Sequence, residues 1–273
     1  MQKMNIQDLF SLKGKIAVVT GATGLLGKYH CKALDESGAT VIVCDVHKKE
    51  VIKFASSLKN NSKSYVLDVT NKSSILALKK FLLKEFGRID VLVNNAAIND
   101  MFENPKSALE QSKFENYPLE LWNKSMDVNI TGVFLCSQIL GSEMAKQKKG
   151  SIINIASTYG IIAPDQSLYK DAKGKQTFYK SPAYPVTKGA VISFTKFLAA
   201  YWGKSGVRVN TLSPGGVENL QKKFFIQNYS NKTPLGKMAQ PFDYKGAIIF
   251  LASDASSYMT GANLVVDGGF TIW

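Results

Sequence analysis

The sequence pairs a tyrosine with a lysine four positions later, Tyr184 and Lys188. In a helix this spacing puts the two side chains on the same face, one turn apart. A phenol ionises near pH 10. Moving that ionisation to about pH 7 takes roughly 4 kcal/mol of preferential stabilisation of the phenolate, and a neighbouring ammonium group can supply much of it. The pair therefore predicts a general acid/base that exchanges a proton with a hydroxyl or carbonyl oxygen near neutral pH.

Pro185 directly follows this tyrosine. Proline is tolerated only in the first turn of a helix, and it pushes the preceding residue out of helical geometry. We therefore expect the helix that carries Lys188 to begin at about Tyr184, with the phenol at its mouth. The alternative interpretation of the pair is two exposed side chains on a helix, because this spacing is common by chance.

Two further polar residues, Ser157 and Asn129, could take part in the reaction. Ser157 follows the apolar run Ser151 to Ala156, which is expected to be a strand. It should therefore lie at the carboxyl edge of a sheet, where ligands bind in open α/β folds. There it could donate a hydrogen bond to a substrate oxygen as charge develops, or it could simply cap the strand end. Asn129 lies inside a long helical stretch, where a polar amide is locally disfavoured.

The segment from Thr20 to Gly27 is rich in glycine and lies between an apolar run and a helical pattern. Its glycines allow a sharp turn and a close approach to a pyrophosphate, whose charge would be met by backbone N–H groups and the positive end of the helix. The next apolar run ends in Asp45, whose carboxylate could bind both ribose hydroxyls of NAD and would repel the 2′-phosphate of NADP. We therefore expect NAD. NADP stays as the alternative because His47, Lys48 and Lys49 could hold a phosphate.

Short, continuously apolar runs alternate with helix-length amphipathic segments along the chain. Seven such runs are expected to be strands: Lys15 to Thr20, Thr40 to Asp45, Ser64 to Asp68, Asp90 to Asn94, Ser151 to Ala156, Val207 to Leu212 and Asn263 to Val266. Continuous apolarity indicates strands covered on both faces, and the intervening segments are long enough for right-handed crossovers. The fold class is therefore α/β, a doubly wound seven-stranded parallel sheet of the Rossmann type with helices on both faces, forming a single domain over residues 1–273.

The chain of 273 residues is 45% hydrophobic and 20% charged, as expected for a folded globular protein. Its formal net charge of +13 comes from basic residues scattered along the sequence, so it defines no basic patch. The apolar runs are shorter than a membrane helix requires, and the first ten residues lack the apolar core of a secretory signal. We therefore expect a cytoplasmic protein that binds neither membranes nor nucleic acid.

The three cysteines, Cys31, Cys44 and Cys136, are widely spaced and embedded in apolar stretches. This pattern favours reduced, buried thiols over disulfides or metal ligands. His30 and His47 share no metal-ligand spacing, and the sequence contains no HExxH, CxxC or GxSxG motif. We therefore expect no metal site, and zinc hydrolases and serine hydrolases of the elbow type are disfavoured.

Together, these features resemble the short-chain dehydrogenase/reductase family over nearly the whole chain, from Leu12 to Gly269. The resemblance rests on the order and spacing of several motifs: Thr20 to Gly27, Asp68 and Val69, Asn94 to Ala97, Asn129, Ser157, the Tyr184 and Lys188 pair, Pro214 and Gly215, and Val266 to Gly269. It implies that the catalytic residues are Asn129, Ser157, Tyr184 and Lys188, with Asn129 ordering a water that connects Lys188 to solvent. With the glycine loop, it implies cofactor contacts at Gly21, Thr23, Gly24, Leu26, Gly27, Asp45, Asp68, Val69, Asn95, Ala96, Ala97, Tyr184, Lys188, Pro214, Gly215 and Val217.

Two features depart from the family pattern. The glycine spacing is GxxGxxG where short members have GxxxGxG, and it is more typical of extended members that epimerise or dehydrate nucleotide sugars. Extended members carry a longer carboxyl-terminal substrate domain, whereas this chain ends soon after Val266 to Gly269, so the short type is favoured. Asn219 stands where many members have a threonine.

The gap between Ser157 and Tyr184 is about twice that of most family members. The extra segment, residues 165–181, is expected to overhang the active site, where Lys170, Lys173, Lys175 and Lys180 could help to select a polar or anionic substrate such as a sugar derivative. A solvated surface loop is the alternative. Residues 217–232 match the substrate lid of the family, and the alternative is that Phe224, Phe225 and Ile226 simply pack on the core.

These features predict an NAD-dependent oxidoreductase that interconverts a secondary alcohol and a ketone on a small polar substrate. One alternative is an epimerase or dehydratase that uses NAD transiently. Another is a non-catalytic cofactor-binding regulator or a nucleic-acid binder, which the charge superficially suggests. Family members usually form dimers or tetramers through the helices that contain Asn129 and Lys188. The apolar stretches Val133 to Leu140 and Ala190 to Trp202 are therefore expected to form a homotetramer or homodimer interface.

Overall fold

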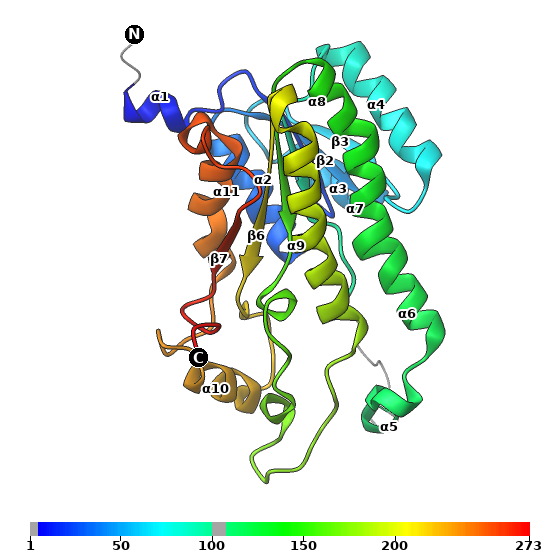
Figure 1. The fold of residues 1–273 in the computed structure, drawn as a ribbon, viewed down its shortest axis with the longest axis vertical. Helices are drawn as coiled ribbons and strands as arrows, with labels where there is room; N and C mark the ends of the chain where they lie inside the picture. The colour runs from blue at the N-terminus through cyan, green and yellow to red at the C-terminus, as the bar shows by residue number, and fades with distance from the viewer. Residues whose placement is uncertain (1–4, 100–107) are drawn as a thin grey trace.

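The computed structural model describes residues 5–99 and 108–273. Its centre is a seven-stranded parallel sheet in the order β3-β2-β1-β4-β5-β6-β7 (Figure 1). The strands are β1 (Ile16–Thr20), β2 (Thr40–Asp45), β3 (Lys63–Val66), β4 (Val91–Asn94), β5 (Gly150–Ile155), β6 (Val207–Pro214) and β7 (Asn263–Val266). Each coincides with one of the seven predicted runs to within one or two residues. The predicted doubly wound α/β fold is therefore confirmed.

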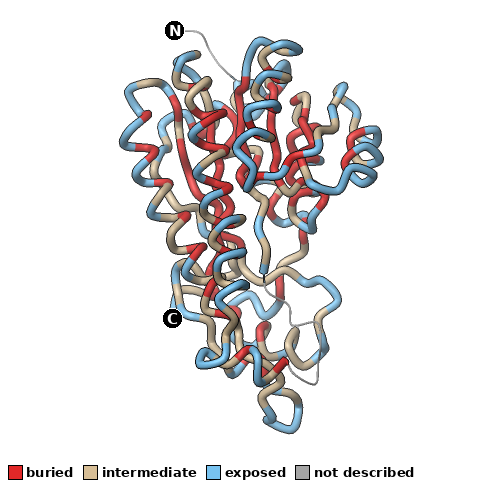
Figure 2. The backbone as a smooth tube through the Cα atoms, turned by 90° about the vertical axis from the view of Figure 1, so that its right-hand side faces the viewer, coloured by how far each residue is buried: buried red, intermediate tan, exposed pale blue. Residues whose placement is uncertain are grey.

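Helices cover both faces of the sheet, which explains why its strands are apolar throughout. Along β1, Ala17 and Val19 enter the core on one face, and Ile16 and Val18 enter it on the other. The helices on the first face are α2 (Leu25–Glu36), α3 (Lys48–Ala55) and α11 (Lys245–Ala252). Those on the second face are α4 (Lys72–Phe86), α7 (Gly132–Cys136), α8 (Ser142–Lys146) and α9 (Ala183–Trp202). The buried strands between these layers form the red centre of Figure 2.

Helices α6 (Leu119–Met126), α7 and α8 form one long helical segment that contains two π-helical turns. The first turn, Asp127–Thr131, carries Asn129, so this residue lies within a long helix as predicted. The second turn is Ser137–Gly141. Single π turns inside α-helices occur frequently at functional sites.

The carboxyl ends of the strands point to one end of the molecule, where three connecting segments extend beyond the sheet (Figure 1). These are the loop that contains the predicted insertion and the helices α5 (Ala108–Ser112) and α10 (Lys223–Asn231), whereas the short helix α1 (Ile6–Phe10) lies at the opposite end. The base of the insertion is packed: Leu168 and Tyr169 are buried together with Tyr229 and Phe270. We call these four residues, with Met238, the aromatic cluster.

Residues 217–232 were expected either to form a substrate lid or to pack on the core, and the structure shows features of both. Phe225 and Ile226 pack against the aromatic cluster, as the core alternative required. Phe224 and Phe225 both line a cavity at the carboxyl end of the sheet. Helix α10 is therefore anchored by part of its apolar face and presents the rest to the cavity.

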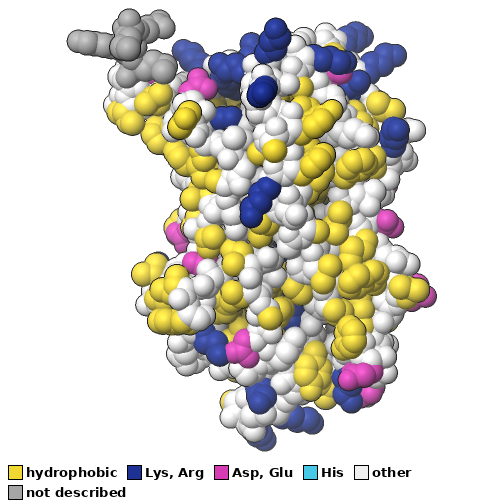
Figure 3. All heavy atoms as spheres, viewed as in Figure 1, with side chains coloured by type: hydrophobic (Ala, Val, Ile, Leu, Met, Phe, Trp, Pro, Cys, Tyr) yellow, Lys and Arg dark blue, Asp and Glu magenta, His cyan; other side chains and the backbone are white. Residues whose placement is uncertain are grey.

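The structure shows where the basic side chains and the cysteines lie. On the face shown in Figure 3, Lys and Arg side chains gather toward the top and the bottom of the molecule, and few lie between. Cys31, Cys44 and Cys136 are buried, as predicted, and none of them is in a disulfide in the described part of the chain. Among the described residues, every helix is too short or too polar to span a lipid bilayer.

Candidate active site

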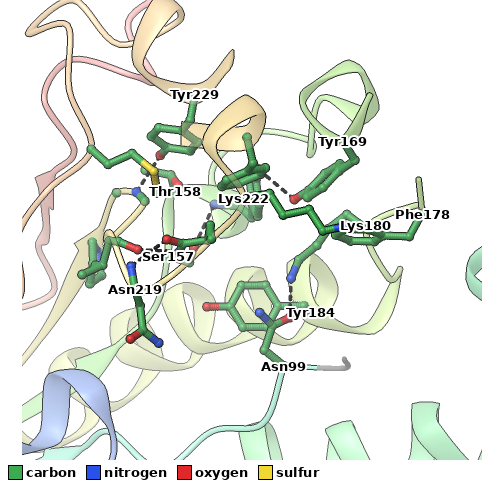
Figure 4. Close-up of a pocket in the computed structure, with 18 of the residues that line it drawn as sticks. Asn99, Ser157, Thr158, Tyr169, Phe178, Lys180, Tyr184, Asn219, Lys222 and Tyr229 are labelled. Atoms are coloured by element: carbon green, nitrogen blue, oxygen red, sulfur yellow. Dashed lines mark hydrogen bonds between the residues drawn. The ribbon is translucent and has the colours of Figure 1, made fainter. Parts of the chain in front are cut away.

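A cavity of about 1100 Å³ opens at the carboxyl end of the sheet. Ser157, Tyr184 and Lys188 all line it. Ser157 lies two residues after the end of β5, while the other two residues come from the first two turns of α9. That helix begins at Ala183, one residue before the start that Pro185 predicted. The Tyr184 hydroxyl points to the side of the cavity on which Ser157 lies (Figure 4).

Lys188 is buried beside the tyrosine. Its Nζ lies 5.7 Å from the centroid of the Tyr184 ring and donates a 2.7 Å hydrogen bond to the carbonyl oxygen of Ile155. Burial disfavours the ammonium form and lowers the pKa of Lys188 from its ordinary value of 10.5 to about 8. The lysine therefore has a fixed position and a proton that leaves more easily than that of an exposed lysine.

The pKa of Tyr184 departs from the sequence-based expectation. Burial raises the pKa of this phenol, and hydrogen bonding with Ser157 opposes the increase only partly. We expected the ammonium of Lys188 to lower the pKa of the phenol. In the protein without a bound dinucleotide, the pKa is shifted in the opposite direction. The reason is desolvation, which depends on the packing around the hydroxyl and was not considered in an argument from helical spacing.

Asn129 lies behind the cavity wall, where it is buried, and joins two parts of the site. Its side chain accepts a 2.8 Å bond from the Ile98 N–H and donates a 2.9 Å bond to the Ile98 carbonyl oxygen. Its amide also donates to Thr187 Oγ1, which in turn donates to the Tyr184 carbonyl oxygen. Asn129 therefore connects the loop after β4 to the start of α9.

Replacing Asn129 with alanine should lower the free energy of unfolding by about 2–3 kcal/mol, because both Ile98 backbone groups lose their partner in a site with 1% exposure of Asn129. Denaturant titration of the purified protein measures this change. Asn123→Ala, at an exposed position of α6, is the matched control and should unfold at the wild-type midpoint. Equal midpoints for the two variants would contradict the assignment.

The glycine loop after β1 brings backbone groups very close together. Gly21 has φ +60°, and a Cβ on it would lie 2.7 Å from Ala96 Cα. A Cβ on Gly27 would lie 2.2 Å from the Gly21 carbonyl oxygen. Gly24, which has no side chain to cap the helix, is the N-cap of α2. The loop and the start of α2 therefore offer backbone amides at the surface, an arrangement that fits the pyrophosphate of a dinucleotide.

Side chains at two strand ends, one on each side of β1, support this loop. Asp45 Oδ2, at the end of β2, accepts bonds from Thr23 N–H (3.0 Å) and from Thr23 Oγ1 (2.7 Å). Asn95 Nδ2, after β4, donates to the Thr20 and Gly21 carbonyl oxygens at 3.0 and 2.9 Å. The predicted acidic residue at the end of β2 is therefore in contact with the predicted phosphate loop.

The other predicted cofactor positions divide into two groups. Six of them line the cavity together with the catalytic candidates: Leu26, Asn95, Ala97, Pro214, Gly215 and Val217. Another eight lie around it at the same edge of the sheet, in loops, at the end of β2 or in the first turn of α2: Gly21, Thr23, Gly24, Gly27, Asp45, Asp68, Val69 and Ala96. Asp68 Oδ1 accepts bonds from the backbone and hydroxyl of Thr70, and Asn219 lines the cavity where a threonine is usual.

The sequence did not single out two residues next to the tyrosine. Lys180 Nζ lies 4.5 Å from the centroid of the Tyr184 ring, and it donates to Asn99 Oδ1 (Figure 4). Both residues line the cavity. Lys180 was one of four equivalent lysines in the insertion, and Asn99 had no motif to mark it, because their proximity depends on how two loops pack.

Comparisons with known proteins agree with this arrangement. A family model described as short chain dehydrogenase matches residues 15–227. The chain is 34% identical over 270 residues to an NAD-dependent glycerol dehydrogenase of Listeria innocua, with 96% of each chain covered. It is 32% identical to a D-threitol dehydrogenase of Mycolicibacterium smegmatis, with 99% of this chain and 98% of that protein covered.

Among solved structures, a gluconate 5-dehydrogenase from Burkholderia cenocepacia in complex with NADP and tartrate has a TM-score of 0.84. It is 29% identical, and the match covers 98% of this chain and all of that one, 100%. Similarity of sequence and of fold thus extends over nearly the whole chain. The protein belongs to the short-chain dehydrogenase/reductase family and is an oxidoreductase.

Proposed function

We propose that the protein catalyses the NAD-dependent interconversion of a secondary alcohol and a ketone in a polyhydroxy compound. One observation carries this proposal: Ser157, Tyr184 and Lys188 line the same cavity as Leu26 and Pro214, positions expected to contact the dinucleotide. The relatives named glycerol dehydrogenase and D-threitol dehydrogenase support a polyhydroxy substrate.

Each residue has a separate task in this proposal. The bound dinucleotide would accept or supply the hydride. The Ser157 hydroxyl donates a hydrogen bond to the substrate oxygen, and Tyr184 exchanges a proton with that oxygen. The ammonium of Lys188 favours the phenolate form of Tyr184 and opposes the effect of its burial. Asn129 acts as a positioning residue through the start of α9.

The test is an assay of the purified protein with NAD and with NADP against glycerol, threitol, glucitol and the corresponding ketoses. A dehydrogenase accumulates reduced cofactor in proportion to the ketone formed. An enzyme that returns the hydride to its substrate would change the substrate without net reduction of the cofactor, and this result would contradict the proposal.

The choice of NAD over NADP is part of the proposal and is supported by the position of Asp45. In Asp45→Asn, the loss of the negative charge should reduce the ratio of kcat/KM for NAD to kcat/KM for NADP about tenfold, because repulsion of the 2′-phosphate disappears. The asparagine oxygen can still accept a bond from Thr23, which preserves the loop. Steady-state kinetics and fluorescence titration with both cofactors measure the change.

Asp68→Asn is the matched control for this variant. Asp68 lies one strand further along the same edge, and its carboxylate bonds Thr70. Its replacement should weaken both cofactors alike and leave their ratio unchanged. A ratio that falls equally in both variants, or in neither, would show that Asp45 does not select the cofactor.

We also propose that the protein is a homotetramer whose interface includes α9. The observation that supports this is a row of stacked, solvent-exposed rings: Phe197 is 61% exposed and Tyr201 is 69% exposed, with their ring centroids 5.9 Å apart. Light scattering coupled to size-exclusion chromatography should give four times the monomer mass. Phe197→Ser should yield smaller species, and a wild-type monomer would contradict the prediction.

A further inference from the structure

The structure separates the four lysines of the insertion into two pairs. Lys170 and Lys173 are exposed and lie outside the set of described residues that line the cavity. Lys175 and Lys180 belong to that set. Lys222, the N-cap of α10, lines the cavity as well. The insertion thus directs only part of its positive charge at the active site.

Lys180 is held by contacts of both its backbone and its ammonium group. Its backbone N–H donates a 2.8 Å bond to Gln166 Oε1, and its carbonyl oxygen accepts a bond from Gln166 Nε2. Its ammonium lies 4.5 Å from the centroid of the Tyr184 ring and donates to Asn99. Both ends of the side chain are therefore held, and its charge lies beside the phenol rather than moving freely in solvent (Figure 4).

The insertion that carries Lys180 is itself anchored. The Tyr169 ring packs between Phe178 and Phe225, with centroid distances of 4.5 and 5.3 Å. Asn228 of α10 donates hydrogen bonds to the carbonyl oxygens of Leu168 and Lys170. Because the insertion and α10 hold each other, Lys180 and Lys222 face one cavity from two connected walls.

Positive charge exceeds negative charge among the described residues that line this cavity. Among the described residues that line it are four lysines and one carboxylate, Asp171. The Asp171 carboxylate already accepts bonds from the N–H groups of Lys173 and Lys175 within its own turn. Lys188 is bonded to Ile155 and serves Tyr184. Lys175, Lys180 and Lys222 therefore give the described part of the cavity lining an excess of positive charge.

We propose that the substrate carries a carboxylate or phosphate group near its reacting carbon, and that Lys180 is the specificity residue that binds it; this inference rests on the proposed function. A substrate oxygen must approach the Tyr184 hydroxyl to exchange its proton. Substituents on the neighbouring carbons then come within reach of the ammonium beside that ring. An anionic substituent forms a charge-assisted hydrogen bond there, which is about twice as strong as the bond a neutral hydroxyl forms.

The experiment compares neutral and anionic compounds of the same carbon chain. D-Threitol and D-glucitol are the neutral members, D-threonate and D-gluconate carry a carboxylate, and the terminal phosphates of the two polyols carry a phosphate. Calorimetry measures their binding to the NADH-loaded protein, in which an alcohol cannot be oxidised, and steady-state assays with NAD measure kcat/KM. Lys180→Met removes the charge, Lys180→Arg keeps it, and Lys173→Met is the matched control on the same loop.

We expect an anionic member to bind at least tenfold more tightly than its neutral partner in the wild type, in Lys180→Arg and in Lys173→Met. In Lys180→Met this ratio should fall to within threefold of one. The ratio isolates substrate recognition, because any effect of Lys180 on the phenol changes all substrates alike. Whether the carboxylate or the phosphate compounds bind more tightly identifies the anionic group of the substrate.

The outcomes separate this inference from the proposed function. Anion-selective binding that Lys180→Met abolishes supports the inference even where no alcohol is oxidised, and in that case only the proposed function is wrong. Equal binding and turnover of neutral and anionic members, or a Lys180→Met effect of the same size on both, overturns the inference and leaves the oxidoreductase intact. Failure of every anionic member to bind also overturns it.

Discussion

Tyr184→Phe is expected to lower kcat about 10³-fold and to leave the dissociation constant of NAD within threefold of the wild-type value. The substitution removes the hydroxyl that exchanges a proton with the substrate oxygen, and general acid/base catalysis contributes 10²- to 10⁴-fold in enzymes. It keeps the ring between Lys180 and Lys188. Because the glycine loop and Asp45 are unchanged, dinucleotide binding should survive.

Steady-state kinetics on the best substrate of the screen, together with titration of the protein's tryptophan fluorescence with NAD, measure both quantities. Tyr201→Phe is the matched control, since this residue lies on the same helix and is 69% exposed. It should keep full activity. If Tyr184→Phe retained more than a tenth of the wild-type kcat, the phenol would not be the proton-transfer group and the proposed chemistry would be wrong.

Lys188→Met should have opposite effects on activity and stability. Activity should fall about 10²-fold, because the phenolate of Tyr184 loses its buried ammonium neighbour. Stability should rise at pH 7. Burial lowers the pKa of Lys188 from 10.5 to about 8, so keeping this group charged in the folded protein costs about 3 kcal/mol. Loss of the bond to the Ile155 carbonyl offsets part of the gain, which leaves a net increase of about 1–2 kcal/mol in the free energy of unfolding.

The stability difference between Lys188→Met and the wild type should depend on pH. Between pH 8 and 10.5, Lys188 of the folded wild type has lost its proton while the unfolded chain still holds it. The unfolded state binds more protons in this window, so the free energy of unfolding of the wild type rises with pH there relative to that of Lys188→Met. The stability advantage of the variant should therefore be complete below pH 8 and disappear as the pH rises to 10.5.

Denaturant titrations at pH 7, 9 and 10.5 measure these differences. Lys196→Met, at an exposed position of the same helix, controls for the loss of one positive charge and should show no such pH dependence. A Lys188→Met protein that is less stable than the wild type at pH 7 would mean that the bond to Ile155 outweighs the burial of the charge.

The local sequence determined the fold and much of the site. Seven apolar runs predicted the strands because the faces of a doubly wound sheet are both covered, and this requirement acts on every residue of a strand. Pro185 predicted the start of α9 to within one residue, because the constraint of proline on its neighbour is local. The glycine loop and Asp45 were recognisable for the same reason, since a turn and a strand end need only a few consecutive residues.

Tertiary structure decided what depended on contacts between distant segments. The bonds of Asn129 to Ile98, the burial that raises the pKa of Tyr184, and the choice of Lys180 among four lysines arise from packing between parts of the chain that no local pattern relates. Desolvation and the direction of a long side chain depend on every neighbour in space. The sequence by itself therefore specified which elements form and where the reacting groups start, while the packed fold determined which charges reach the phenol.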